Sequence, residues 1–203
     1  MIRFEDITVA GLEVAVKAMR NPLNSWDMSD SHYECGMFVI GENDLSLMRK
    51  LYKGGTEHRK FMRQVYVAVT ITAPLYWWKQ MDQFKVGTTT DSCSTMHAIH
   101  KRDLTLEDFA YDGLDELGMK ALRLYIDLLN GYREGYNVTK KKVYWDCLIK
   151  LLPECYMQKR TLTMNYEVAV NIIRQRRGHK LSEWEEMIKM LTCLPYLKEI
   201  MDE

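Results

Sequence analysis

The segment from Val65 to Thr72, with the sequence VYVAVTIT, constrains the fold more than any other part of the chain. Its residues are mostly β-branched or aromatic and its apolar side chains alternate, which is typical of a β-strand. Pro74 follows at once. We expect this proline in the first turn of the next helix, where its missing N–H costs little.

Helical spacing of apolar residues accounts for most of the rest of the chain. It predicts helices over Glu13–Met19 and over Asp44–Tyr52, the second ending at Gly54-Gly55. Trp26–Gly41 is turn-rich, and we expect a loop or a short strand there. From Leu104 onward the chain is predicted to be mostly helical. The helices expected there cover 119–129 before Gly131, 142–152 before Pro153, 166–177 before Gly178, and 183–190 behind a capping box of Ser182 and Glu185.

These patterns predict one α+β domain over residues 1–203, with few strands and five or more helices. A chain of 203 residues is long enough to bury a substantial core. The 14 methionines are typical of core packing or of a subunit contact.

Charge and composition narrow the classes of partner. Lys+Arg and Asp+Glu number 28 each, so the formal net charge is zero, and we expect no nucleic-acid partner. No apolar run approaches the ~20 residues that span a bilayer, and the N-terminus is too acidic for a signal peptide. The five cysteines form no CxxC pair, which is typical of reduced thiols in a cytoplasmic protein.

The segment from Ala73 to His97 carries the densest chemistry. It begins as an aromatic-rich helix, breaks at Gly87 and continues as a loop rich in hydroxyl groups. The hydroxyl-bearing residues are Thr88, Thr89, Thr90, Ser92, Ser94 and Thr95. Hydroxyls and backbone N–H groups are donors suited to a polar, anionic ligand. His97 and His100 have no matching set of carboxylates or cysteines, so we expect no metal site.

This segment also matches the first of three blocks that define one enzyme family. The block reads R-H-R-x-x-S-x-N-x-x-S-x-R and follows a helix that begins Ala-Pro and carries a glutamine. Ala73-Pro74 and Gln80 stand at the matching places. The marker letters fall on Gln83, Phe84 and Lys85 for R-H-R, on Thr88 and Thr90 for the next Ser and Asn, on Cys93 or Ser94 for the second Ser, and on Thr95 for the closing Arg.

The other two blocks lie upstream and downstream. Upstream, H-E-T-P-F-E-H is replaced by the run from His58 to Arg63 (HRKFMR), with His58 at the first histidine. The downstream pattern is L-P-x(9)-T-x-N-x-R-x(3)-N-x(4)-R. It is matched in register by Leu152-Pro153, Thr163, Asn165, Asn171 and Arg176, with Glu167 at the place of its first arginine. Over about 44–186 the chain therefore resembles the flavin-dependent thymidylate synthases, as a divergent member with a degraded signature motif.

The resemblance implies an α+β fold with a small central antiparallel sheet, flanked by several helices, and a helix-rich C-terminal half. In the resembled family FAD takes a methylene group from a folate and passes it to dUMP, and reduced nicotinamide supplies electrons. The expected cofactor is FAD. The expected ligand is a pyrimidine nucleotide such as dUMP, with NADPH and methylenetetrahydrofolate as candidate co-substrates. The family's homotetramer implies sites shared between subunits.

The register carries over binding residues but no catalytic residue. Those implied to contact the cofactor are His58, Lys60, Lys85, Thr88, Thr90, Asn165 and Asn171, and those implied to contact the substrate are Gln80, Asp91, Ser94 and Arg176. Plainer roles remain open: the residues around His58 could form a solvated turn, Arg176 could serve a helix C-terminus, and the two asparagines could cap neighbours.

Three functions are compatible with these features. The first is a flavin-dependent enzyme of the thymidylate-synthase type. The second is a non-catalytic relative that serves as an oligomeric nucleotide-binding or structural module. It is motivated by the loss of R-H-R and by Thr95, since a missing arginine removes about 1.5–3 kcal/mol of binding to a phosphate. The third is an unrelated helical scaffold, which predicts no strand pairing for Val65–Thr72 and no cleft near Arg176. The aromatic run Tyr76, Trp77 and Trp78 is expected to pack in the core or at a subunit interface rather than to stack on a flavin.

Overall fold

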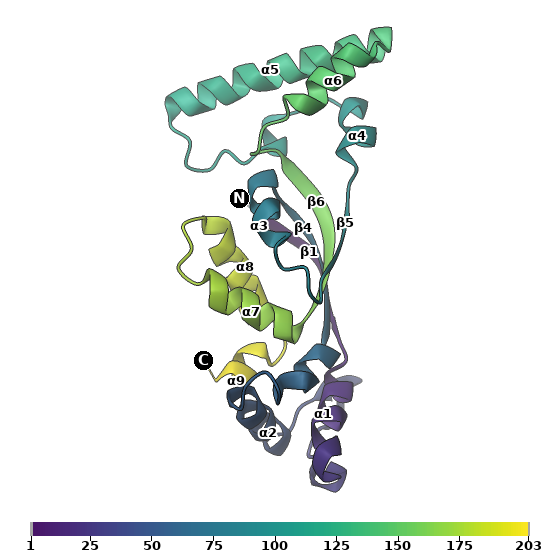
Figure 1. The fold of residues 1–203 in the computed structure, drawn as a ribbon, viewed down its shortest axis with the longest axis vertical. Coiled ribbons are helices and arrows are strands. Elements are labelled where there is room, and N and C mark those ends of the chain that lie inside the picture. Colours follow the sequence, from purple (N-terminus) through teal and green to yellow (C-terminus); the bar gives the residue numbers. More distant parts are fainter. Residues whose placement is uncertain (1, 203) are drawn as a thin grey trace. The chain divides into compact units, whose positions relative to one another are not determined.

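The computed structural model describes residues 2–202 and divides them into two compact units. The first unit holds Arg3, Thr70–Gln83 and Thr90–Thr161. The second unit holds Phe4–Val69, Phe84–Thr89 and the chain from Leu162 onward. A single domain over residues 1–203 stays a prediction. Figure 1 labels the helices and the strands of the main sheet.

The main sheet is antiparallel, with the strand order β1-β4-β6-β5. Its strands are β1 (Arg3–Ala10), β4 (Tyr66–Pro74), β5 (Thr89–Ser92) and β6 (Met157–Asn165). β4 has a neighbour on each side, and its residues Val67, Val69 and Ile71 are fully buried. The predicted strand, the α+β class and the small antiparallel sheet are therefore confirmed.

The first unit contains four helices in addition to parts of these strands. They are α3 (Leu75–Met81), α4 (Thr95–Ala98), α5 (Glu116–Thr139) and α6 (Lys142–Lys150), with short 3₁₀ turns at Ile99–Lys101 and Leu106–Asp108. α6 lies along α5 (Figure 1). The buried cluster between them consists of Ile99, Leu104, Phe109, Leu122, Ile126, Leu129 and Leu148. Trp77 and Trp78 of α3 are fully buried and meet edge to face at 4.9 Å, which confirms their predicted place in the core.

The second unit is built from five helices. They are α1 (Leu12–Arg20), α2 (Glu42–Lys53), α7 (Tyr166–Arg176), α8 (Ser182–Thr192) and α9 (Leu197–Met201). 3₁₀ turns at Asn21–Leu23, Trp26–Met28 and Arg59–Gln64 and a hairpin of β2 (His32–Glu34) and β3 (Met37–Val39) connect them. The helices predicted from Glu13, Asp44 and Tyr166 are confirmed within a few residues, and the loop expected over Trp26–Gly41 contains the hairpin.

Three predicted boundaries are wrong. Pro74 has extended backbone angles and is the last residue of β4, so it precedes α3 rather than standing in its first turn. α3 ends at Met81 and not at Gly87. α5 continues through Gly131 to Thr139 because α6 covers its second half, where a Cβ on Gly135 would lie 3.0 Å from the ring of Tyr144. Tertiary packing outweighs the roughly 1 kcal/mol cost of a helical glycine.

Two further expectations for the C-terminal half need correction. Residues 157–165 form a strand in a region expected to be mostly helical, because the neighbouring strands of the sheet supply its hydrogen-bond partners. Ser182 is the first helical residue of α8, and Leu181 before it has no side-chain cap, so the predicted capping box is absent. α9 then follows α8 as a further helix. No helix found between residues 2 and 202 combines the length and the hydropathy needed to cross a membrane.

Candidate functional site

The hydroxyl-rich segment begins with a tight turn at Gly87 in the second unit. Gly87 has φ +79°, in the left-handed region that favours glycine. A Cβ at this position would lie 3.0 Å from Cγ2 of Val168 and 3.2 Å from Nδ2 of Asn165. The hydroxyl of Thr88 donates a hydrogen bond back to the carbonyl of Phe84. Glycine therefore lets this turn pack directly against the first residues of α7.

Asn165 stands where β6 ends and α7 begins. Its side-chain oxygen accepts a hydrogen bond of 3.1 Å from the N–H of Val168, so it is the N-cap of the helix. This is the capping role that the sequence left open for Asn165, whereas the half-buried Asn171 lies within α7. The amide nitrogen of Asn165 nevertheless lies beside the Gly87 turn.

Arg176 is the last residue of α7, and two aromatic rings hold its guanidinium. The guanidinium carbon lies 5.1 Å from the centre of the Phe84 ring and 4.9 Å from that of Trp184. Cation–π contacts of this kind hold a guanidinium in place without consuming its hydrogen-bond donors. The Nε of Arg176 is buried and has no hydrogen-bond partner within residues 2–202. It is therefore a donor available to an acceptor that the chain itself does not provide.

The same arginine lines a cavity of about 410 Å³ with Gly178, His179 and Lys189. The turn and the guanidinium thus meet at Phe84, whose carbonyl binds Thr88 and whose ring packs on Arg176. The third hypothesis, an unrelated helical scaffold, predicted that there is no cleft near Arg176 and that Val65–Thr72 does not pair with another strand. The cavity and the strand pairing are both present, so that hypothesis is wrong.

A buried ion pair connects the segment around His58 to α7. Arg59 Nη2 lies 3.6 Å from Glu167 Oε1, and the two side chains are 6% and 9% exposed. The Arg59 guanidinium also lies 5.5 Å from the centre of the Tyr52 ring. His58 and Lys60 on either side are exposed, as a solvated turn or a ligand-facing segment would be. The pair therefore fixes the backbone that presents these two side chains.

The signs of the two charges in this pair are the reverse of those in the family pattern. The resembled family has a glutamate after its first upstream histidine and an arginine in its downstream block. This chain has Arg59 and Glu167 at these two places, so both charges are reversed, and the two residues are in contact. Two charge changes at positions that contact each other leave the pair here with opposite charges, which is consistent with the register on which the resemblance rests.

The predicted site residues divide between the two units. The cofactor candidates His58, Lys60, Lys85, Thr88, Asn165 and Asn171 and the substrate candidate Arg176 belong to the second unit. The substrate candidates Gln80, Asp91 and Ser94 and the cofactor candidate Thr90 belong to the first unit. Direct packing brings together the turn at Thr88, Asn165 and Arg176. Lys85, Thr90, Asp91 and Ser94 are exposed, and Gln80 is half-buried in α3.

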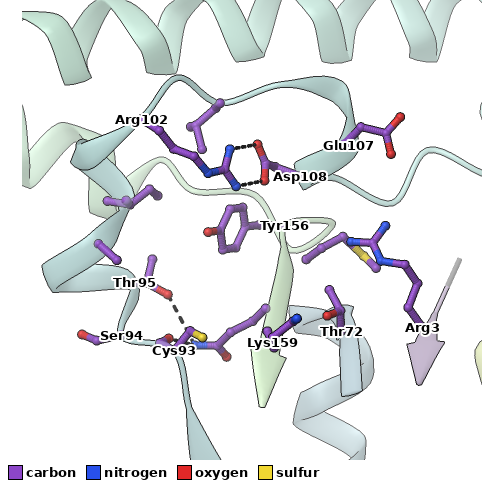
Figure 2. Close-up of a pocket in the computed structure, with 15 residues that line it drawn as sticks. Arg3, Thr72, Cys93, Ser94, Thr95, Arg102, Glu107, Asp108, Tyr156 and Lys159 are labelled. Carbon is purple, nitrogen blue, oxygen red and sulfur yellow. Dashed lines mark hydrogen bonds and ion pairs between the residues drawn. The ribbon is translucent and has the colours of Figure 1, made fainter. Parts of the chain in front are cut away.

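The first unit contains a second cavity, of about 270 Å³, at the far end of the hydroxyl-rich segment (Figure 2). Cys93, Ser94 and Thr95 line it together with Tyr156, and burial raises the pKa of that tyrosine. The hydroxyl of Ser94 accepts a bond of 3.3 Å from the N–H of His97 and so caps α4. Thr95, at the place of the closing arginine of the family marker, therefore faces a cavity.

Charged residues surround this second cavity. Arg102 binds both carboxylate oxygens of Asp108, as Figure 2 shows. Burial raises the pKa of Asp108, but hydrogen bonds from Arg102 and Thr105 outweigh it, so the net pKa is below its ordinary value. Asp108 thus neutralises Arg102. Arg3, Lys159 and Glu107 also line the cavity, so its wall carries charges of both signs.

Several residues of both sites were not among the predicted ones: Arg59, Glu167, Trp184, Arg102 and Asp108. For Arg59 and Glu167 a signal existed, since both depart from the family pattern by a change of charge. Nothing in the sequence pairs Trp184 with Arg176. No group of three or more potential metal ligands occurs among the residues that the structure describes.

The fold has counterparts among solved structures, although no protein-family model matches the sequence and no curated protein matches it. The flavin-dependent thymidylate synthase ThyX from Helicobacter pylori, complexed with FAD and dUMP, has a TM-score of 0.69 at 16% identity, covering 98% of each chain. Another structure of that enzyme with FAD and dUMP has a TM-score of 0.67 at 16% identity, covering 100% of this chain and 96% of the other. The UMP/dUMP methylase PolB from Streptomyces cacaoi, bound with 5-Br dUMP, has a TM-score of 0.63 at 15% identity, covering 94% and 88%. The protein has the fold of the flavin-dependent thymidylate synthases, as its sequence blocks imply.

Proposed function

We propose that this protein binds FAD and a pyrimidine nucleotide such as dUMP and catalyses a reductive one-carbon transfer of the dTMP-forming type. The proposal rests on the contact between the hydroxyl-rich turn and Arg176, in a fold shared with structures solved with FAD and dUMP. Bound FAD would supply the electron-transfer and one-carbon chemistry, and the protein supplies binding and orientation.

The residues of the second unit fit an anionic ligand that carries a flat ring. Arg176 offers a buried Nε donor without a partner, in a guanidinium that Phe84 and Trp184 hold flat. The amide of Asn165 lies beside the turn at Gly87. Exposed Lys60 and Lys85 belong to the same unit and attract negative charge as point charges, and exposed His58 adds a ring nitrogen that can bond a ligand. These are the residues that we assign to cofactor and nucleotide binding.

Thr95 stands where the family marker has its closing arginine, so a phosphate group needs another positively charged partner in this chain. The cavity that Thr95 lines is also lined by Arg3 and Lys159. With Arg102 they put three cations on a wall that also carries two carboxylates, those of Glu107 and Asp108. Ser94 and Thr95 add hydroxyl donors, so we assign an anionic group such as a phosphate to this cavity, which is lined by residues of the first unit alone. NADPH and methylenetetrahydrofolate as co-substrates, a homotetramer and a cytoplasmic location are parts of the same proposal.

The second candidate function is a non-catalytic nucleotide-binding or structural module. Two observations favour it. Phe84 stands where the marker has histidine, and its ring packs on Arg176. Asp108 neutralises Arg102 in the cavity of the first unit. Such a protein would bind the nucleotide without transferring a carbon unit.

The absorbance spectrum of the freshly purified protein is the first test. We expect the visible bands of bound flavin, or quenching of flavin fluorescence when FAD is added to the colourless protein. Addition of dUMP to the reduced holoprotein with methylenetetrahydrofolate should then yield dTMP. Flavin and dUMP binding without dTMP would support the nucleotide-binding module. The absence of both kinds of binding would refute the enzyme and the nucleotide-binding module and leave only a structural role.

Substitution of two arginines that stack on aromatic rings tests whether Arg176 itself binds the nucleotide. Arg176→Ala should weaken nucleotide binding about tenfold or more, since a hydrogen bond to a charged group contributes about 1.5–3 kcal/mol. Arg160→Ala is the matched control: Arg160 stacks on Trp78 at 4.4 Å, but Asp82 occupies its guanidinium at 2.9 Å. Equal binding by both variants would remove Arg176 from the site.

A further inference from the structure

Gln158 of β6 binds the hydroxyl-rich segment at two points. Its amide nitrogen Nε2 lies 3.2 Å from the carbonyl oxygen of Cys93 and 3.4 Å from Oγ1 of Thr95. The contact with Thr95 is the dashed line drawn at that residue in Figure 2. All three residues line the cavity of the first unit. One side chain therefore controls two oxygen atoms on the wall of this cavity.

The orientation of the Gln158 amide is fixed from two sides. A carbonyl oxygen accepts hydrogen bonds and cannot donate them, so the atom that faces Cys93 must be the amide nitrogen. On the other side, Nε of Arg160, which donates and cannot accept, lies 3.0 Å from Oε1 of Gln158. Either contact alone is sufficient, so substitution of Arg160 should leave the amide in the same orientation. Gln158 is thus the donor in both of its contacts with the segment.

This donor determines what the hydroxyl of Thr95 offers to a ligand. A hydroxyl has one hydrogen to donate and two lone pairs that accept. Gln158 occupies a lone pair of Thr95, and the hydrogen of this hydroxyl has no acceptor among residues 2–202. Thr95 is half-buried and lines the cavity. Its hydroxyl is therefore available as a donor to a group that enters the cavity.

The contact with Cys93 removes an acceptor from the same wall. A carbonyl oxygen without a partner would repel the oxygens of an anion, and the amide of Gln158 occupies it instead. Ser94 lies between Cys93 and Thr95, and its hydroxyl oxygen accepts the N–H of His97. Its hydrogen is then left to donate, as that of Thr95 is. On this side the cavity presents hydroxyl donors, because the acceptors beside them are already used.

The charges elsewhere on the wall are compatible with an anionic ligand. Arg102 binds both carboxylate oxygens of Asp108 and so neutralises this acid. Glu107 is exposed, and water and salt screen its charge. Arg3 and Lys159 add positive charge. An oxyanion in the cavity therefore meets cations on one part of the wall and hydroxyl donors on the part that Gln158 organises.

We infer that Gln158 is a positioning residue that makes the cavity of the first unit selective for oxyanions. Its amide occupies the carbonyl of Cys93 and the hydroxyl oxygen of Thr95, so this wall offers donors that suit a group with only acceptor oxygens, such as a phosphate or a sulfate. This role rests on the proposed function, which assigns an anionic group such as a phosphate to the cavity. It also explains how a threonine serves an anion at the place of a family arginine.

Calorimetric titration with dUMP and with deoxyuridine, in the presence of excess FAD, isolates the contribution of the phosphate. The ratio of the two dissociation constants measures it, since a variant that only loosens the protein changes both constants together. Gln158→Glu keeps the shape of the side chain but replaces its donors by charged acceptors, so this ratio should fall about tenfold or more. Gln158→Met removes the donors without adding charge and should lower the ratio about two- to tenfold.

A charge control and variants of Thr95 show whether the effect is specific. Gln64→Glu adds the same charge at an exposed residue that does not line the cavity, and it should leave the ratio unchanged. Thr95→Ser keeps the hydroxyl and should preserve the ratio, whereas Thr95→Val should lower it. In the Thr95→Val background, Gln158→Met should have a smaller effect than in the wild type, because the two residues share one bond. Fully additive effects would overturn the action of Gln158 through Thr95.

Titration with sulfate separates this role of Gln158 from the proposed function. If the wild type binds dUMP more tightly than deoxyuridine and both Gln158 variants keep the ratio, the inference is overturned and the proposed function stands. If the wild type binds no nucleotide but binds sulfate, and Gln158→Glu abolishes sulfate binding, the oxyanion preference stands and the proposed function fails. Equal binding of dUMP and deoxyuridine by the wild type, or no binding of any of these ligands, would overturn the inference. Circular dichroism should show the variants folded, and Gln158→Met carries the test if Gln158→Glu does not fold.

Discussion

Arg59 and Glu167 form a buried ion pair, 3.6 Å between Nη2 and Oε1, that ties the 3₁₀ turn Arg59–Gln64 to α7. Neither partner is fully satisfied, since Nε of Arg59 and Oε2 of Glu167 are buried without a hydrogen-bond partner among the described residues. Such a pair holds two segments in register, and it leaves each charge strongly dependent on the other.

Substitution of one partner of this pair should lower the free energy of unfolding strongly, and exchange of the two residues should lower it less. Arg59→Glu and Glu167→Arg each bury two like charges, so we expect each to lower the free energy of unfolding by about 3–5 kcal/mol. The double exchange restores attraction in the polarity of the family pattern and should recover at least about half of the loss. Urea denaturation of the four proteins measures this coupling. If the double variant is as unstable as the sum of the single variants, the two residues do not interact.

Substitutions of two glycines should separate the cost of a left-handed backbone from the cost of a collision with α7. Gly87→Ala should destabilise the protein by about 1–2 kcal/mol through its left-handed backbone, and further through collision with Val168. Gly113→Ala is the control, because Gly113 has the same φ of +79° and no atom within 4 Å of the added Cβ. Thermal unfolding compares the two. We also expect only Gly87→Ala to weaken flavin binding, and equal effects of both variants would show that the approach to α7 is unimportant.

Two substitutions of Asn165 should distinguish its capping role from ligand binding. Asn165→Ala removes the acceptor for the N–H of Val168 and should cost about 0.5–2 kcal/mol of stability. Asn165→Ser keeps a capping oxygen but loses the amide nitrogen beside Gly87, so its stability should stay close to that of the wild type. Flavin titration then gives the answer: weaker binding by the serine variant assigns the amide to the ligand, and unchanged binding leaves Asn165 as a cap alone.

Stability in acid should depend on Asp44. Burial raises the pKa of its carboxyl, but hydrogen bonds of 2.6 Å from Ser29, Ser31 and Arg20 outweigh burial and leave the pKa below its ordinary value. A folded-state pKa below the unfolded value gives stability that is present above the unfolded pKa, at about 3.9, and is lost as pH falls through the folded value.

The contribution of Asp44 should therefore be constant from neutral pH down to about pH 4 and should decline in stronger acid. Asp44→Asn should cost about 3–5 kcal/mol at neutral pH because Arg20 is left buried without its partner. Denaturation curves at several pH values should show the wild type and the variant converging below about pH 4. A difference that stays constant into strong acid would mean that the carboxylate charge is not what stabilises this cluster.

Local sequence was sufficient for elements whose residues contact one another along the chain. The alternation in Val65–Thr72 predicted β4, and the apolar spacing predicted α1, α2 and α7. The side chains that share a buried face are two residues apart in a strand and three or four apart in a helix, so a short stretch of sequence contains the signal. The register of the three blocks also predicted the fold. The sequence did not predict, however, that residues 157–165 form a strand ending at Asn165, since β6 forms only when the strands beside it are in place.

The sequence by itself determined the residue types available for binding: a turn rich in hydroxyls, an arginine at the end of α7 and a net charge of zero. Only the tertiary structure decided which of them meet. Phe84 contacts the guanidinium of Arg176, and Arg59 contacts Glu167, each across about a hundred residues of chain. Contacts at such separation depend on how whole elements pack, and no pattern within a short window specifies them.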